Sequence, residues 1–306
     1  MISVCVPVYR FFVLPQDQGL LRTIRPGEEG SLQTLYQQLQ ASGLEFELRV
    51  YEDASPPPYP ATNQLIANLG PEVVYKLLPK NLGRAKIRNL LAQEARYPQL
   101  LFLDADSGIP TGFVQAYLPY LDPRRFPVVQ GGRTYPARAQ LAANYWLHQR
   151  YGLQRERLDP NATGDDLYRG FQTNNFLVSR DLLLTHPFPS DFSGYGHEDT
   201  LWGWQLKARQ VPVFRIDNPV IHLGLEAADV FLRKQEEAVV NLKQLEQQQP
   251  NLPSRLGDFA RRWAWCKPII SPIVRQLGPF AKRQLLKGRP LYWLDVLKLN
   301  WYWRNS

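Results

Sequence analysis

Apolar and polar positions in the first 130 residues alternate between two periodicities. Short apolar runs rich in β-branched residues favour strands buried on both faces, as in a parallel sheet. Longer segments with apolar residues on one side favour helices that connect such strands. The pattern predicts strands at 2–8, 46–51, 73–77 and 99–103, and helices at 31–41, 62–69 and 83–95. This order is typical of an α/β domain.

The alternation continues less regularly along the rest of the chain. It predicts strands at 126–130, 175–179, 211–216 and 220–222, and helices at 137–151, 198–208 and 226–248. We therefore expect a first domain at 1–225 with two halves, 1–130 and 131–225. A long helix at 226–250 and an extension at 251–306 would follow.

Composition and charge narrow the class of protein. The 306 residues are 44% hydrophobic and 21% charged, which is typical of globular proteins. Two distant cysteines, Cys5 and Cys266, argue against a disulfide framework and favour a reducing compartment. With no signal peptide and no apolar run of spanning length, we expect a cytoplasmic protein.

The net charge of +8 is concentrated at one end of the chain. Residues 251–306 carry 11 bases and two acids, whereas residues 1–250 are nearly balanced. Five of the eight tryptophans also lie there: Trp263, Trp265, Trp293, Trp301 and Trp303. Interleaved aromatic and basic residues favour peripheral attachment to the anionic inner face of a membrane. The alternative is a helical extension whose tryptophans pack on the protein. No recognisable nucleic-acid module accompanies the charge, so we expect no nucleic-acid partner.

Two aspartates follow the apolar run at 100–103 directly. Asp104 and Asp106 stand where ligands collect in open α/β sheets, and residues i and i+2 point to the same side of a strand. Paired carboxylates suit a hard divalent cation such as Mg²⁺ or Mn²⁺. A solvated Asp-x-Asp turn is the alternative.

A second group of polar residues begins the helix at 198–208. Glu198 and Asp199 follow Gly194-Tyr195-Gly196-His197. Acids in a first helical turn serve as caps, but a carboxylate there could also accept a proton from a substrate hydroxyl. His222 ends a predicted strand and could return to the same site as a metal ligand, or be an ordinary hydrogen-bonded histidine.

Two weaker signals lie at the same predicted edge. Glu52 and Asp53 end the second strand, and the segment at 80–89 opens a helix with basic and amide side chains suited to a diphosphate. Each alone would be ordinary turn chemistry.

Taken in order, these motifs resemble the family-two glycosyltransferases with the GT-A fold. The matching segments are SVCVPVYR, VYEDASP, KNLGRAKIRN, FLDADS and GYGHEDTLWGWQL, with VIHLG downstream. GYGHEDTLWGWQL and VIHLG together are most similar to the galactosyl- and N-acetylgalactosaminyltransferase branches. The resemblance covers roughly residues 1–225 and depends on the co-occurrence of the motifs.

The resemblance implies a role for each matching position. One set would surround the nucleotide sugar: Pro7, Tyr9 and Asp53 at the base, Asn81 and Arg88 near the nucleotide, Asp104 at the ribose or a metal-bound water, and Asn174 and Asn175 at the sugar. Asp104, Asp106 and His222 would serve a Mn²⁺ or Mg²⁺ ion. Glu198 would hold the acceptor, and Asp199 would be the catalytic base.

The resemblance implies transfer of a sugar from a UDP-linked donor to a hydroxyl of a glycan or a lipid-linked acceptor, with inversion. It also implies that the half at 1–130 binds the nucleotide sugar and that the half at 131–225 binds the acceptor and contains the catalytic residues. The sequence departs from the family in an insertion at 10–30 and in Phe259, which replaces the glutamine of the processive Gln-x-x-Arg-Trp motif. We therefore expect one sugar per event, as in polysaccharide biosynthesis by single additions. A sugar nucleotidyltransferase and a non-catalytic sugar-nucleotide-binding module are the alternatives.

Overall fold

The computed structural model describes residues 1–13, 32–190, 198–248 and 254–304. The insertion at 10–30 and the Gly194–His197 part of the acidic motif therefore lie almost entirely outside the described residues. The chain forms two compact units. Among the described residues, unit 1 comprises 1–13, 32–140, 156–190 and 198–224, and unit 2 comprises 141–155, 225–248 and 254–304.

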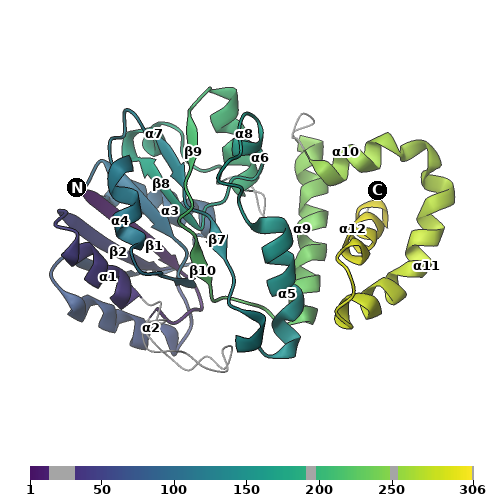
Figure 1. The fold of residues 1–306 in the computed structure, drawn as a ribbon, viewed down its shortest axis with the longest axis horizontal. Helices are drawn as coiled ribbons and strands as arrows, with labels where there is room; N and C mark the ends of the chain where they lie inside the picture. Colours follow the sequence, from purple (N-terminus) through teal and green to yellow (C-terminus); the bar gives the residue numbers. More distant parts are fainter. Residues whose placement is uncertain (14–31, 191–197, 249–253, 305–306) are drawn as a thin grey trace. The chain divides into compact units, whose positions relative to one another are not determined.

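Unit 1 is built on a sheet of seven strands (Figure 1) in the order β3-β2-β1-β4-β8-β6-β9. The strands are β1 (Ile2–Val8), β2 (Phe46–Glu52), β3 (Val73–Leu77), β4 (Gln99–Leu103), β6 (Val128–Gln130), β8 (Asn175–Ser179) and β9 (Val213–Arg215). β3, β2, β1 and β4 are parallel, and β8 runs antiparallel to both of its neighbours. The predicted α/β class is confirmed.

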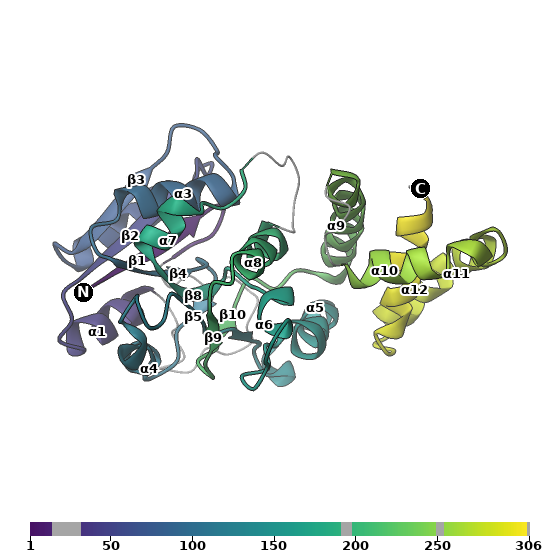
Figure 2. The same cartoon turned by 90° about the horizontal axis from the view of Figure 1, so that it is seen from above.

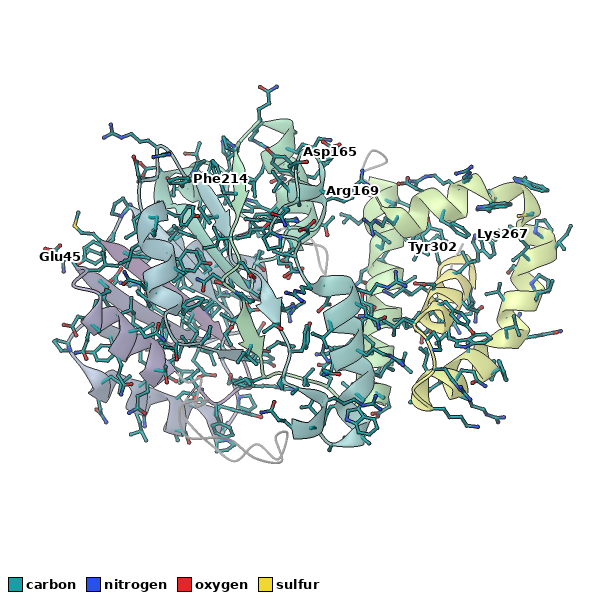
Figure 3. All side chains as sticks on the ribbon, in the orientation of Figure 1. Glu45, Asp165, Arg169, Phe214, Lys267 and Tyr302 are labelled. Carbon is teal, nitrogen blue, oxygen red and sulfur yellow. The ribbon has the colours of Figure 1, made fainter. Side chains whose placement is uncertain are left out.

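Side chains alternate across this sheet and build two apolar cores. On β4, Leu101 and Leu103 join one core, whereas Leu100 and Phe102 join the other. The first core includes α1 (Leu32–Ala41) and α4 (Phe113–Tyr117), and the second includes α3 (Arg84–Glu94), α7 (Arg180–Thr185) and α8 (Glu198–Ala208). Figure 2 shows α1 and α4 on one side of the sheet and α3 and α7 on the other. Phe214, labelled in Figure 3, packs against the first core.

A small second sheet stands at the carboxyl end of β4. It has the order β5-β10-β7, with β5 (Ser107–Gly108), β10 (Val220–His222) and β7 (Arg133–Thr134). His222 pairs with Ser107, directly beyond the two aspartates of the Asp-x-Asp motif. The strand predicted at 220–222 is confirmed, and its place in this second sheet brings His222 back to the end of β4.

Unit 2 is helical and consists of α5 (Trp146–Tyr151), α9 (Ala228–Gln248), α10 (Arg255–Arg262), α11 (Lys267–Leu286) and α12 (Tyr292–Arg304). Figure 1 shows α12 between α9 and α11, and it contacts both. The single helix predicted at 137–151 is wrong in its first part. Two short 3₁₀ turns, Arg138–Gln140 and Ala143–Tyr145, precede α5. Between them the buried Leu141 forms a β-bridge, which interrupts the predicted helix.

The five tryptophans of the extension divide into two groups, the first of which packs on unit 2. In this first group, Trp293 is partly buried against the core. Trp301 and Trp303 are buried in the core of unit 2, where Tyr302 (labelled in Figure 3) also donates a hydrogen bond to Glu246 at 2.6 Å. Trp263 and Trp265 are exposed. Packing on the protein thus accounts for the first group but not for the second. In the described part of the chain, no helix is long and apolar enough to cross a membrane.

Candidate active site

The two aspartates after β4 have different partners. Asp104 is held by Arg88 of α3, whose guanidinium Nη2 lies 2.6 Å from its Oδ1. Asp106 faces β10, where its Oδ2 lies 3.3 Å from Nδ1 of His222. The backbone fixes both positions, because the Asp104 N–H donates to the carbonyl of Asn174 and the Asp106 carbonyl accepts from Leu223. The end of β4 therefore places Asp104 against the guanidinium of Arg88 and Asp106 against the imidazole of His222.

The electrostatic surroundings of Asp106 favour its charged form. Burial by itself raises the pKa of this carboxyl. His222, Arg133 and Arg84 act in the opposite direction and outweigh burial, so that the pKa falls to about 2. Asp106 is consequently ionised at neutral pH, as a metal ligand must be.

Because Gly224 has no side chain, the carboxylate of Asp106 fits beside its backbone. A Cβ atom added at Gly224 would lie 2.0 Å from Oδ2 of Asp106. We expect Gly224→Ala to push this carboxylate away from His222 and to lower kcat/KM about a hundredfold, since a misplacement of about 1 Å has that effect in active sites. Steady-state kinetics measures it. Gly170→Ala is the matched control, because the nearest atom to its added Cβ lies at 3.6 Å, and equal activity of the two variants would contradict the placement.

A partly buried arginine completes the cluster around the Asp-x-Asp motif. Arg133 of β7 forms an ion pair of 2.8 Å with Glu156, and both Asp104 and Asp106 raise its pKa further, against the effect of burial. The ring of Tyr135 packs edge-on to His222 with centroids 5.5 Å apart. These contacts orient the imidazole and add a fixed positive charge near the two aspartates.

The segment before β8 contains two adjacent asparagines with opposite surroundings. Asn175 accepts from the Tyr117 hydroxyl at 2.7 Å and donates to the carbonyls of Gly132 and Asn218, each at 2.9 Å. Asn174 is also buried, yet neither atom of its amide has a hydrogen-bond partner among the described residues. Buried amides without partners are uncommon and costly, so the Asn174 amide is available to a ligand.

This contrast separates stability from binding. We expect Asn175→Ala to lower the free energy of unfolding by about 3 kcal/mol, because it leaves buried partners unpaired. Asn174→Ala should leave stability unchanged or raise it, while weakening donor binding about tenfold, because only a ligand loses a hydrogen bond. Denaturant unfolding and donor titration measure the two effects. A large loss of stability in Asn174→Ala would contradict the assignment.

The acids that begin α8 are held from two sides. Asp199 accepts from the hydroxyl of Thr173 at 2.9 Å and from the Thr173 backbone N–H at 3.3 Å. Glu198 lies 3.8 Å from the guanidinium of Arg84. Burial and the neighbouring Glu198 raise the pKa of Asp199, and Arg88, Thr173 and Arg84 only partly offset them. A carboxylate with a raised pKa is a better proton acceptor than an ordinary aspartate.

The predicted base pocket lies at the ends of β1 and β2. Pro7 pairs with Tyr51 in the sheet, and Tyr9 is exposed just beyond β1. The two oxygens of Asp53 accept from the backbone N–H groups of Leu82 at 2.7 Å and Gly83 at 2.9 Å. The Asn81 amide donates to the Asp53 carbonyl at 3.0 Å. Asp53 and Asn81 thus fix the loop that begins α3, and each Asp53 oxygen keeps a lone pair for a ligand.

Electrostatic coupling joins these groups into one site. Arg84 influences both Asp106 and Asp199, and Arg88 influences Asp199 while it pairs with Asp104. For a metal ion the donor set is small, because the described residues contain no group of three or more His, Cys, Asp or Glu side chains that could hold one. Asp106 and His222 are together, whereas Asp104 is engaged by Arg88. Two protein ligands fit a cation that completes its shell with phosphate oxygens and water.

Three charged or polar residues of this site had no individual role in the sequence analysis: Arg84, Arg133 and Tyr135. Arg84 lies within the basic segment at 80–89, and Arg133 follows Gly131-Gly132 directly after a predicted strand. A basic residue directly after a strand and two glycines could have indicated that Arg133 belongs to the site. No sequence pattern indicated the contact of Tyr135 with His222, since that contact depends on the second sheet.

The sequence profile described as "Glycosyl transferase family 2" matches residues 27–183, which is half of the chain. The chain belongs to this family. It is a glycosyltransferase with the GT-A fold, an enzyme that transfers a sugar from a nucleotide sugar. Among curated protein sequences none matches the chain. The family match does not distinguish the galactosyl- and N-acetylgalactosaminyltransferase branches from the rest of the family.

Two solved structures are similar to this glycosyltransferase at low sequence identity, and the first of them shares its fold. A mannosyltransferase, PcManGT from Pyrobaculum calidifontis, in complex with GDP-Man and Mn²⁺, is 14% identical with a TM-score of 0.58. That alignment covers 99% of this chain and 85% of the mannosyltransferase. S. aureus TarS 1–349 in complex with UDP-GlcNAc is 16% identical with a TM-score of 0.48, over 98% of this chain and 89% of TarS.

Proposed function

We propose that this glycosyltransferase moves one sugar from a nucleoside diphosphate donor to a hydroxyl of a glycan or a lipid-linked acceptor, and inverts the anomeric carbon. The observation that carries the proposal is the single electrostatically coupled site with Asp106 and His222 at 3.3 Å and a separate carboxylate, Asp199, of raised pKa. A metal-side pair and a basic carboxylate are the two parts that an inverting displacement needs.

Asp106 and His222 would hold a Mn²⁺ or Mg²⁺ ion. The place of Asp106 beside His222 supports this role, as does Mn²⁺ in the complex of the mannosyltransferase PcManGT. When bound, such an ion stabilises the charge that develops on a departing diphosphate. Arg133 and the Arg88–Asp104 pair would position the ligand around it.

Asp199 would accept the proton of the acceptor hydroxyl. Its hydrogen bonds from Thr173 fix its orientation, and the neighbouring Glu198, paired with Arg84, would hold the acceptor. A base on the side of the sugar opposite the leaving group directs the hydroxyl to that side. A single in-line displacement then inverts the centre.

The donor would lie along the ends of β1, β2 and β4. Pro7, Tyr9 and Asp53 would surround the base, Asn81 would position the loop before α3, and Asn174 would bind the sugar. Asn175, whose amide is used by the chain, would support Asn174. We favour a UDP-linked donor and the galactosyl- or N-acetylgalactosaminyltransferase-like branches because of the motif resemblance around Glu198.

A lipid-linked acceptor would bring the enzyme to a membrane surface, for which residues 251–306 are the candidate. In this proposal the residues that bind the donor and catalyse the transfer all lie within 1–225. The family match favours sugar transfer over the sugar nucleotidyltransferase and the non-catalytic module.

The direct test offers the purified full chain a panel of nucleotide sugars with Mn²⁺ and follows release of the nucleoside diphosphate. We expect turnover with one donor or a few related donors, and proton NMR of the product should give the anomer opposite to that of the donor. A product with retained configuration would contradict the role of Asp199. Release of pyrophosphate would indicate a nucleotidyltransferase.

A further inference from the structure

Helix α11 has two faces of different kinds. Val274, Gly278, Ala281 and Leu285 are buried and point toward the core of unit 2. Ile269, Ile273, Leu277 and Phe280 are exposed and follow one another at spacings of three and four residues, which places them on a second face about a third of a turn from the buried one. They form a continuous apolar stripe, and its last member, Phe280, also packs edge-on against Trp293 of α12 with ring centroids 5.2 Å apart.

The stripe continues into the preceding elements. Trp265 is 77% exposed and Ile269 is 69% exposed, which is unusual for large apolar side chains. The ring of Trp265 lies 6.3 Å from that of Trp263, which lies 6.2 Å from that of Phe259 in α10. We name the following set the apolar ridge: Phe259, Trp263, Trp265, Ile269, Ile273, Leu277 and Phe280.

The charge around the ridge has one sign. No Asp or Glu occurs between Asp258 and Asp295. Eight bases lie in that interval: Arg261, Arg262, Lys267, Arg275, Lys282, Arg283, Lys287 and Arg289. Of these, only Arg261 forms an ion pair with an acid in the described part of the chain. Lys267, labelled in Figure 3, stands where α11 begins.

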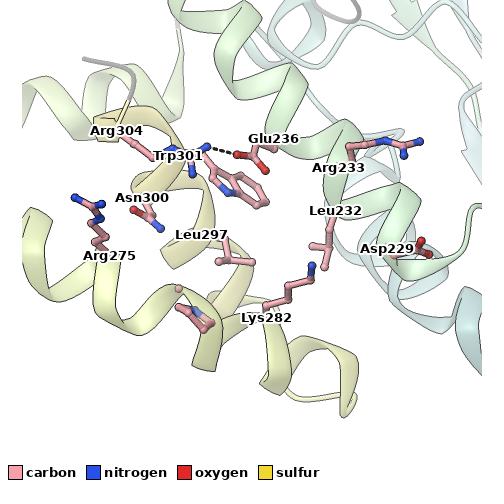
Figure 4. A pocket seen from close by; sticks show the side chains of 12 residues that line it. Asp229, Leu232, Arg233, Glu236, Arg275, Lys282, Leu297, Asn300, Trp301 and Arg304 are labelled. Atoms are coloured by element: carbon pink, nitrogen blue, oxygen red, sulfur yellow. Dashed lines mark hydrogen bonds and ion pairs between the residues drawn. The ribbon is translucent and has the colours of Figure 1, made fainter.

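A cavity in unit 2 gathers further bases on the flank of α11. It has a volume of about 490 Å³ and lies between α9, α11 and α12 (Figure 4). Arg275 and Lys282, two helical turns apart on α11, line it together with Arg233, and with Arg304, which pairs with Glu236. Asp229 and Glu236 line the cavity as well, and no residue of the apolar ridge does. Arg275 and Lys282 lie nearly half a turn around α11 from the ridge, so the cavity is separate from it.

We propose that the apolar ridge of α10 and α11 lies flat on an anionic lipid bilayer, with the surrounding bases at the headgroup level. Amphipathic helices with aromatic residues on one face and bases beside it bind membranes in this way. Nucleic acid would leave the aliphatic part of the ridge without partners. A second copy of this chain would bring two positively charged surfaces together. Anionic lipid satisfies both the ridge and the charge.

Flotation of the full chain with lipid vesicles tests the proposal. We expect binding to phosphatidylcholine vesicles that contain phosphatidylglycerol, weaker binding at high salt, and little binding to phosphatidylcholine alone. The variant Trp265→Ser/Ile269→Ser/Ile273→Ser should weaken binding about a thousandfold, since each substitution loses about tenfold. Arg262→Gln/Arg283→Gln/Lys287→Gln should also lose about a hundredfold, or about fivefold for each charge.

Matched controls change similar residues elsewhere on the surface. Leu65→Ser/Leu184→Ser removes exposed apolar side chains, and Arg124→Gln/Arg209→Gln removes exposed charges from unit 1. Both should float like the parent. All substituted positions are exposed, and an unchanged thermal midpoint checks the fold. Flotation of the ridge variant equal to that of the parent would overturn the proposal, as would equal binding to neutral vesicles.

Other occupants of the ridge give distinct results in the same experiment. Binding of DNA or RNA without binding of vesicles, or a dimer that the ridge variant abolishes without vesicle binding, would overturn the lipid assignment. No step of the assay requires sugar transfer. A failure here therefore leaves the proposed chemistry untouched, and the converse also holds.

Discussion

Asp199→Asn should abolish sugar transfer while donor binding stays nearly intact. The amide keeps the size of the side chain and can still accept from Thr173, but it cannot take a proton from the acceptor. Loss of a general base lowers kcat by about 10²–10⁴-fold. Initial rates at saturating donor measure the loss, and calorimetric titration with the donor measures binding. Asp166→Asn, an acid in the first turn of α6 (Asp166–Arg169), is the matched control and should retain full activity.

The pH dependence of this reaction has a definite sign. Asp199 works as a base only when ionised, and its pKa is raised above the ordinary 3.8 by burial and by Glu198. We therefore expect kcat to fall as pH decreases through the raised pKa, with a midpoint above that ordinary value. The residual rate of Asp199→Asn should lack this acidic limb. Unchanged turnover in Asp199→Asn, or the same acidic limb in both proteins, would reject Asp199 as the base.

Removal of the divalent cation should have the second large effect. We expect EDTA to abolish transfer and Mn²⁺ or Mg²⁺ to restore it, with a loss on the order of 10³-fold, because an ion stabilises the leaving diphosphate by several kcal/mol. Asp106→Asn and His222→Gln should each weaken Mn²⁺ binding in the presence of nucleoside diphosphate. Electron paramagnetic resonance of free Mn²⁺ measures this without any turnover.

The control for the histidine is His186→Gln, since His186 lies outside the coupled site and contributes a backbone carbonyl to Trp202. It should bind Mn²⁺ like the parent. Asp104→Asn should weaken Mn²⁺ binding less than Asp106→Asn, because Asp104 is engaged by Arg88 at 2.6 Å. Full activity in chelator, or Mn²⁺ binding independent of both Asp106 and His222, would remove these two residues from the metal role.

The fold was predictable from local pattern to a large extent. The strands at 2–8, 73–77 and 99–103 have the predicted bounds. β1 and β4 are nearly continuous apolar runs, as expected of strands buried in a parallel sheet, whereas β3 stands at the edge and only its Val73 is buried. The segment at 137–151 has mixed periodicity, and there the interruption by the buried Leu141 was not predictable. For residues 251–306 the sequence suggested a helical extension but gave no bounds for its individual helices.

The candidate site was predictable in its residue types more than in its contacts. The sequence singled out Asp104, Asp106 and His222, but the partners of the two aspartates depend on where α3 and β10 reach the end of β4. The unpaired amide of Asn174 and the fully paired amide of Asn175 are neighbours in the same motif. No local pattern separates two adjacent asparagines.

By itself, the sequence determined the α/β class, the strand ends with acidic residues, and the concentration of positive charge after residue 250, since each depends on residue type and local period. The tertiary structure alone decided that Asp106 faces His222, that Gly224 makes room for them, and that Trp301 is buried while Trp265 is exposed. The physical reason is that such contacts join residues far apart along the chain. Their distances follow from the packing of whole elements rather than from any local preference.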